Sequence, residues 1–250
     1  MSDSVIANQH MDYNHPLLEG QFLKRYKRFF AEVNLANESV IAHVPNTGSL
    51  ASICDEPRLC RLLKSDDPKR KLKFTLEQVK TESSWVGVNT QNANTLGWES
   101  FQNQLIPHWQ GYSEAVREIK INDSTRLDMK LYSHKTKPDH FVEIKNVTFA
   151  RNGCALFPDA VTTRGQKHLR ELIELKQRGF STEIFFLIQR TDCSEFSPAF
   201  EIDQDYGKLL IEAQKAGVKV SAYSATLERD RITLNADKEI KISLRSKRNQ

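Results

Sequence analysis

The hydrophobic pattern of the chain changes near residue 89, and this change constrains the fold more than any other feature of the sequence. Before it lie short runs of β-type residues at 21–25, 29–35, 40–44, 59–64 and 74–80. Turn-forming sequences separate the runs, among them Pro-Asn-Thr-Gly at 45–48 and Asp-Asp-Pro at 66–68. Short strands at this spacing predict a small closed β-barrel of the OB type.

The sequence after residue 89 predicts a mixture of helices and strands. Apolar residues at helical spacing, followed by Pro107, predict a helix at 94–105. Further strands are expected at 116–121, 127–132, 140–148, 184–188 and 218–223, and further helices at 166–178 and 205–216. This order predicts an α/β domain with a mixed sheet. We therefore expect two domains, an all-β barrel at 1–88 and an α/β domain at 89–250.

Composition and cysteine usage narrow the class of protein. No stretch approaches the run of about 18 apolar residues that a membrane span needs. The first 14 residues lack the pattern of a signal peptide. The cysteines form no C-x-x-C pair; they are Cys54, Cys60, Cys154 and Cys193. We expect a cytoplasmic protein with reduced thiols and no membrane partner.

Basic residues are concentrated in a few short segments, although the net charge is only +4. The first group interleaves with aromatic residues and comprises Lys24, Arg25, Lys27 and Arg28. The second comprises Lys69, Arg70, Lys71 and Lys73, and a third, of less weight, lies in the tail at Arg245, Lys247 and Arg248. Such groups suit phosphates better than base edges and predict nucleic-acid binding, most simply to DNA without sequence preference. The alternative is that they are solvated charges on loops.

A pair of carboxylates is predicted where two of the strands meet. Apolar and charged residues alternate in both 127–132 and 140–148. In an antiparallel hairpin, the register that pairs Met129 with Val142 also pairs Leu127 with Ile144 on one apolar face. The same register places Asp128 opposite Glu143. Opposed carboxylates repel each other unless a cation lies between them.

A hard divalent cation, Mg²⁺ or Mn²⁺, would suit this pair, because such ions take carboxylate oxygens and keep several waters. Lys145 lies two positions after Glu143, hence on the same face, within reach of a metal-bound water or a phosphate. Asp128, Glu143 and Lys145 therefore predict a site for phosphodiester hydrolysis. The alternative is a surface Glu-x-Lys pair, which is common on half-exposed strands. Glu99 on the preceding helix is either a further metal ligand or a solvated side chain.

The segment leading into the helix at 166–178 is a candidate phosphate site. Arg164 and Lys167 lie near its N-terminal turn, where free N–H groups and the helix dipole favour anions. Thr163 and Gln166 also have the spacing of a capping box, which would make Gln166 purely structural. His168 alone indicates neither a metal site nor a nucleophile–base pair, so no catalytic role is assigned to it.

Several segments taken together resemble one family. The most specific is FPDAVTTRGQKHLREL at 157–172, and the others are 23–29, 45–48, 65–71, 88–90, 126–128 and 143–148. From about residue 20 to 243 the chain resembles the sugar fermentation stimulation protein A (SfsA) family. The segment at 50–63 departs from the family's usual glycine-containing run.

The resemblance implies an OB-like N-terminal domain and a C-terminal domain like the PD-(D/E)XK nucleases. It also implies non-specific DNA binding and a regulatory link to sugar (maltose) metabolism, and it places the nuclease-type positions at Asp128, Glu143 and Lys145. Two functions are therefore open. One is a metal-dependent nuclease, and the other is a DNA-binding regulatory factor of sugar metabolism whose site is catalytically idle.

Overall fold

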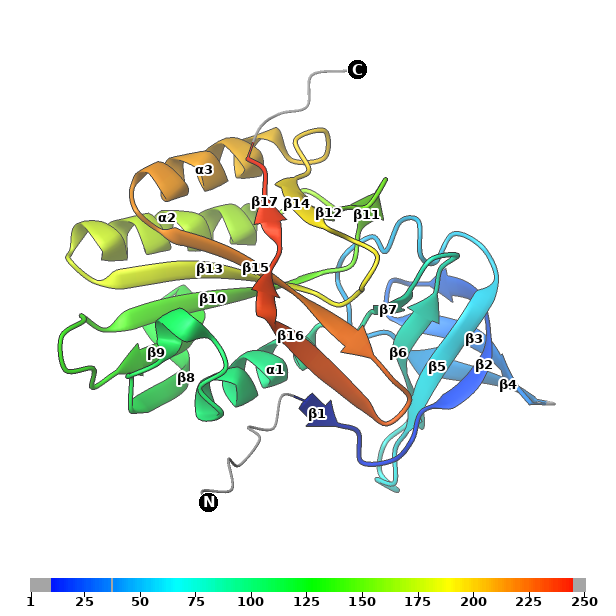
Figure 1. The fold of residues 1–250 in the computed structure, drawn as a ribbon. Helices are drawn as coiled ribbons and strands as arrows, with labels where there is room; N and C mark the ends of the chain where they lie inside the picture. The colour runs from blue at the N-terminus through cyan, green and yellow to red at the C-terminus, as the bar shows by residue number, and fades with distance from the viewer. Residues whose placement is uncertain (1–9, 37, 245–250) are drawn as a thin grey trace.

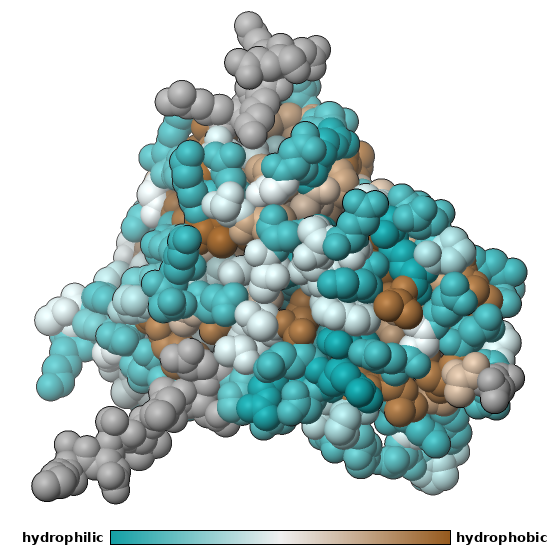
Figure 2. Space-filling view, turned by 45° about the vertical axis from the view of Figure 1, so that its right-hand side comes forward, coloured by the Kyte–Doolittle hydropathy of each residue, from teal (hydrophilic) through white to brown (hydrophobic). Residues whose placement is uncertain are grey.

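The computed structural model describes residues 10–36 and 38–244, which form a barrel beside a larger sheet with helices on both faces (Figure 1). The basic group at 245–248 and most of the segment searched for a signal peptide lie outside these residues. Within the described part of the chain, no helix is long and apolar enough to cross a membrane. Figure 2 shows a mostly hydrophilic face on which hydrophobic residues form small separate patches.

The barrel is built from the strands that the N-terminal pattern predicts. They are β2 (Leu18–Tyr26), β3 (Phe30–Leu35), β4 (Glu38–His43), β5 (Arg58–Lys64) and β6 (Phe74–Lys80), to which the short β7 (Trp85–Gly87) is added. The strand order is β4-β3-β2-β5-β6-β7, and a parallel pairing of β4 with β6 closes the barrel. Phe22, Leu62 and Leu76 are fully buried inside it. The predicted small β-barrel is thereby confirmed.

The second part is a seven-stranded mixed sheet in the order β1-β16-β15-β13-β10-β9-β8. Its strands are β1 (His10–Asp12), β8 (Glu114–Asn122), β9 (Thr125–Tyr132), β10 (His140–Val147), β13 (Ser181–Ile188), β15 (Lys219–Leu227) and β16 (Arg231–Glu239). The central strands β10, β13 and β15 are parallel, and their neighbours are antiparallel. This arrangement confirms the predicted α/β domain with a mixed sheet.

Helices cover both faces of this sheet (Figure 1). On one face lie α2 (Thr163–Gln177) and α3 (Gln204–Lys215), each followed by a glycine with positive φ, Gly179 and Gly217. Glycine adopts this left-handed conformation without steric cost, so it terminates both helices. On the other face lie α1 (Gln91–Gln102) and the short 3₁₀ helix η1 (Pro107–Trp109). A small four-stranded sheet, β11 (Ala150–Arg151), β12 (Cys154–Phe157), β14 (Glu195–Pro198) and β17 (Lys241–Ile242), was not predicted.

Two elements depart from the sequence-based boundaries. Helix α1 begins at Gln91 rather than at residue 94, because the side chain of Asn89 accepts a hydrogen bond from the Gln91 N–H, 3.0 Å, and starts the helix early. Residues 10–12, which the sequence analysis placed in the barrel domain without predicting a strand, form β1, and β1 pairs with β16 at the edge of the larger sheet. A three-residue strand has too short a pattern to reveal its partner, so residues 10–12 join the second sheet.

Contacts at several points hold the barrel against the larger sheet. The Gly87 N–H donates to the Gln189 carbonyl at 2.9 Å, and the Leu50 N–H donates to the Asp159 carboxylate at 3.0 Å. The buried Glu77 of β6 accepts a hydrogen bond from Asn92 of α1 at 2.9 Å. These bonds connect the barrel to both faces of the α/β part and leave a cleft between them.

Candidate functional site

Strands β9 and β10 separate at the point where the predicted carboxylates lie. Their ladder pairs Leu131 with His140 and Met129 with Val142, which confirms the predicted register. Beyond Met129, the Asp128 side chain replaces a main-chain partner, because its Oδ2 accepts the N–H of Ile144 at 2.7 Å. The predicted pairing of Leu127 with Ile144 on one apolar face is wrong, since the two side chains pack in different cores. The divergence of the strands opens the sheet where these two residues would have paired.

Asp128 is held between the sheet and α1. Its Oδ1 accepts a hydrogen bond from Asn94 Nδ2 at 3.0 Å. Burial, followed by the nearby charge of Glu143, raises the pKa of Asp128 to about 7, although Lys145 opposes the shift. In the metal-free protein this carboxyl therefore carries a proton much more readily than an ordinary aspartate does.

Glu143 is almost completely buried on the other side of the opening. Its Oε1 contacts both Lys145 Nζ and His168 Nδ1. Burial acts to raise the pKa of Glu143, but Lys145 and His168 outweigh it and the pKa is lowered, which keeps this carboxylate ionised. Its Oε2 is also buried and has no hydrogen-bond partner within residues 10–36 and 38–244. A buried carboxylate oxygen without a partner is costly unless something positive binds it.

These side chains line a cleft of about 330 Å³ between the barrel and the larger sheet. The barrel contributes the 46–48 loop, and the α/β part contributes Asp128, Glu143, Lys145 and the start of α2. The guanidinium of Arg25 holds the barrel loop in place by donating to the carbonyl groups of Asn46, Gly48 and Ser49 at 2.8–2.9 Å. The cleft therefore has one wall from each part of the molecule.

The structure brings together Asp128, Glu143 and Lys145 but not Glu99. Glu99 lies on α1 near His10 and Asp12 of β1, and burial followed by Asp12 raises its pKa. It is not among the residues that line the cleft, where Asn94 of the same helix contacts Asp128. Asn94, and not Glu99, is therefore the α1 residue that contacts a predicted carboxylate.

The predicted phosphate-binding residues fall into two sets. Six are exposed: Lys24, Lys27, Arg28, Lys69, Lys71 and Arg164. The others are partly buried: Arg25, Arg70, Lys73 and Lys167. Members of both sets have partners within the protein. Arg25 donates four hydrogen bonds to carbonyl groups, Lys24 pairs with Glu32 at 3.1 Å, Arg70 donates to Thr75 at 2.6 Å, and Lys167 donates to Ser124 at 2.6 Å. Arg25 is thus part of the scaffold of the cleft.

His168 of α2 is a site residue to which the sequence analysis assigned no role. It is 3% exposed, contacts Glu143, and lies 3.5 Å from Lys145 Nζ and 3.4 Å from Arg164 Nε. On α2 it shares the buried face with Leu169, Leu172 and Leu175. A polar residue on the apolar face of a helix was the available signal, because a buried polar group needs a partner.

The start of α2 also differs from the predicted capping box. The N-cap is Thr162, whose side chain accepts the Gly165 N–H at 3.0 Å, so the prediction of Thr163 is wrong. Gln166 donates instead to Asp203, the N-cap of α3, at 3.0 Å. Gln166 links the two helices, and Arg164 remains at the cleft.

A closed barrel joined to an α/β sheet, with an aspartate and a Glu-x-Lys sequence where two strands diverge, defines a class. It is the class of two-domain proteins in which an OB-type barrel is followed by an α/β domain with a mixed sheet.

Comparison with known proteins identifies the family within this class. A model described as the SfsA N-terminal OB domain matches residues 23–88, and one described as the sugar fermentation stimulation protein RE domain matches residues 91–231. The chain belongs to the sugar fermentation stimulation protein (SfsA) family.

Relatives in this family match over nearly their full length. The sugar fermentation stimulation protein homologs of Bdellovibrio bacteriovorus and Pelagibacter ubique are 46% and 42% identical, covering 90% and 93% of this chain and 97% and 99% of theirs. The solved structure of Pyrococcus furiosus SfsA in complex with Ca²⁺ has a TM-score of 0.84 at 25% identity, covering 95% of this chain and 100% of that one. This chain and Pyrococcus furiosus SfsA therefore share one architecture.

Proposed function

We propose that this protein is a divalent-metal-dependent nuclease that hydrolyses phosphodiester bonds in DNA bound without sequence preference. The observation that carries the proposal is the Oε2 of Glu143, which is buried near the carboxylate of Asp128 and has no hydrogen-bond partner in the part of the chain that the structure describes. A buried and a partly buried carboxylate that lie close together favour binding of a cation, because their negative charges otherwise repel each other.

Asp128 and Glu143 fit Mg²⁺ or Mn²⁺, because both supply oxygen ligands of negative charge. When bound, such an ion supplies Lewis-acid activation of a water and of the phosphate. The Pyrococcus furiosus relative was solved in complex with Ca²⁺, another hard cation that prefers oxygen ligands. We therefore assign the role of metal ligands to Asp128 and Glu143, and not to Glu99.

The surrounding residues position these groups and the phosphate. Asn94 and the Ile144 N–H fix the orientation of the Asp128 carboxylate, and His168 fixes that of Glu143. Lys145 places its ammonium group at the carboxylate edge, where it can stabilise negative charge that develops on a phosphate. Arg164 at the start of α2 supplies a second positively charged side chain for the same phosphate backbone.

The exposed basic residues supply a path for the nucleic acid to the cleft. Lys27 and Arg28 form the turn between β2 and β3, and Arg25 links this turn to the cleft loop through the carbonyl groups of Arg28 and Gly48. The turn is therefore beside the cleft wall. Phosphate contacts of this kind give affinity without base recognition.

The test is cleavage of labelled single- and double-stranded DNA and RNA by the purified protein, with Mg²⁺, with Mn²⁺ and with chelator. We expect metal-dependent cleavage by the wild type, and its loss in Asp128→Asn and Lys145→Ala. Lys135→Ala, in the exposed turn between β9 and β10, is the matched lysine control and should cleave normally.

The outcomes separate the two functions. DNA binding that is weakened by salt, with no cleavage under any metal condition, would identify the DNA-binding regulatory factor with an idle site. Cleavage that persists in Asp128→Asn or in chelator would show that the proposed residues are not the site.

A further inference from the structure

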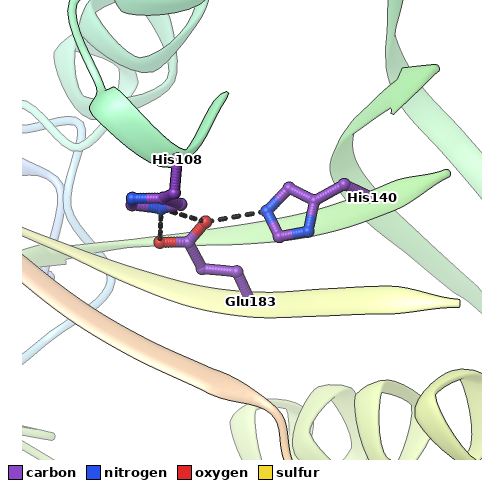
Figure 3. A group of neighbouring side chains, drawn as sticks. All are labelled: His108, His140 and Glu183. Carbon is purple, nitrogen blue, oxygen red and sulfur yellow. Dashed lines mark hydrogen bonds and ion pairs between the residues drawn. The ribbon is translucent and has the colours of Figure 1, made fainter. Parts of the chain in front are cut away.

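Three side chains that the cleft does not use converge on the other face of the seven-stranded sheet. His108 comes from η1, His140 from β10 and Glu183 from β13, and both imidazole rings point at the Glu183 carboxylate (Figure 3). His140 precedes Glu143 by three positions on β10, so the two side chains point to opposite faces. This group is therefore separate from the cleft carboxylates.

The ligand-type atoms of this group are already close together. His108 Nε2 lies 2.9 and 3.0 Å from the two Glu183 oxygens, and His140 Nε2 lies 2.8 Å from Oε2. All three residues offer an atom within 4.8 Å of the others. Ligands of a tetrahedral ion with bonds of about 2.0 Å are roughly 3.3 Å apart. Outward shifts of a few tenths of an ångström in flexible side chains would make room for an ion.

A second layer of hydrogen bonds orients the group. The indole N–H of Trp109 donates to Glu183 Oε2 at 2.7 Å, and the Ser221 hydroxyl donates to Oε1. His140 Nδ1 lies 2.8 Å from Ser181 Oγ. When Nδ1 carries the proton and donates it to Ser181, the lone pair of Nε2 points into the cluster. Metal-binding histidines are typically held in this way through the second ring nitrogen.

Burial and donor chemistry indicate the kind of ion. The Glu183 side chain is fully buried, so its negative charge requires a positive partner in the interior. Two imidazole nitrogens and one carboxylate form a donor set that favours zinc-type ions, whereas Mg²⁺ prefers oxygen alone. The His108 side chain is 25% exposed, which gives an ion a path from solvent.

We propose that His108, His140 and Glu183 bind a divalent transition-metal ion of the zinc type. The ion ties the turn after α1 to the central strands β10 and β13, and three protein ligands leave one position for water. The site stabilises the fold on the face opposite the cleft and takes no part in the proposed phosphodiester chemistry.

The experiment uses the full chain, stripped with chelator and then titrated with Zn²⁺ and separately with Co²⁺. The variants are His108→Gln, which breaks the cluster at its partly exposed member, and Asp128→Asn, which breaks the cleft site. The control is His15→Gln, an exposed histidine that pairs with Asp66 at 2.5 Å. The readouts are bound metal by mass spectrometry, the visible spectrum of Co²⁺ and the melting temperature.

We expect the wild type, Asp128→Asn and His15→Gln each to hold about one Zn²⁺ at this cluster and to show the intense visible bands of four-coordinate Co²⁺. His108→Gln should bind Zn²⁺ more than about 100-fold more weakly, since losing even an outer partner weakens metal sites about 10- to 100-fold. Zn²⁺ should raise the melting temperature of Asp128→Asn, in which the cleft site is broken and this cluster is intact.

Two results would overturn the proposal. One is a wild type that binds Zn²⁺ only through Asp128, with no four-coordinate Co²⁺ spectrum. The other is His108→Gln that keeps the wild-type metal content. Either result would show that the group is an imidazole–carboxylate hydrogen-bond network only. The wild-type spectrum decides the question even where a variant fails to fold, and it does so independently of any nuclease assay.

Discussion

Replacing Asp128 by asparagine should stabilise the metal-free protein at high pH. The folded-state pKa of about 7 compared with the ordinary 3.8 means that ionisation of this carboxyl opposes folding. The difference of about 3 pKa units corresponds to on the order of 4 kcal/mol at 1.36 kcal/mol per unit. Asparagine keeps the side-chain volume, can still accept the Ile144 N–H, and removes the charge that repels Glu143.

The dependence on pH has a definite sign. Because the folded protein holds this proton more tightly than the unfolded chain does, the stability of the wild type falls as pH rises from about 4 to about 7, then levels. The free energy of unfolding of Asp128→Asn does not fall in this way. The difference in free energy of unfolding between Asp128→Asn and the wild type should therefore increase by about 2 to 3 kcal/mol between pH 5 and pH 8.

Urea unfolding in chelator, followed by tryptophan fluorescence at pH 5 and pH 8, measures this difference. Asp123→Asn, at a fully exposed aspartate in the turn between β8 and β9, is the control and should show no such dependence. Adding Mg²⁺ or Mn²⁺ at pH 8 should raise the stability of the wild type and leave Asp128→Asn unchanged. A variant that is less stable than the wild type at pH 8, by the same amount as at pH 5, would refute the reasoning.

Four further predictions concern the barrel. Arg25→Gln should lower the free energy of unfolding by about 3 kcal/mol or more, because four carbonyl groups lose a charged donor. Lys27→Gln should instead leave the melting temperature unchanged and weaken DNA binding. The slope of log affinity against log salt concentration should become shallower by about 1. Phe29→Ala, at an aromatic side chain 40% exposed beside this basic turn, should weaken single-strand binding about tenfold in a filter-binding assay without altering folding. Gly48→Ala should increase the rate of limited proteolysis, because the new Cβ would lie 2.4 Å from an Asp159 oxygen at the contact between barrel and sheet.

Local patterns predicted most of the fold, and long-range pairing explains the rest. The barrel strands have alternating residues and clear turns, so their sequence alone was enough. The pairing that closes the barrel joins β4 to β6, which are not consecutive in the sequence, so no local pattern predicts it. Strand β1 is only three residues long, too short to show a pattern. The short strands β11, β12 and β17 likewise have too few residues to show a period.

The site likewise contains residues that local patterns predict and residues that only long-range packing brings together. Asp128, Glu143 and Lys145 come from adjacent strands whose register follows from their own alternation, so they could be grouped from sequence. Asn94 and His168 join them through helix packing, over 34 and 25 residues of chain. Glu99, five positions after Asn94, points about 140° away around the helix. Which face of α1 packs against the sheet could not be predicted from the sequence.

The pairing of β1 with β16 gives the barrel two covalent connections to the larger sheet. One runs through residues 13–17, anchored by the bonds of Tyr13 and Leu17 to Asp230 and Arg229, and the other through residues 88–90. A body attached at two separated points cannot swing about a single pivot, as domains joined by one linker do. The barrel wall of the cleft is thus restricted to small sliding displacements. Under the proposed function, a nucleic-acid strand in the cleft is accommodated by its own bending more than by opening of the protein, so we expect flexible or single-stranded segments to be the better substrates.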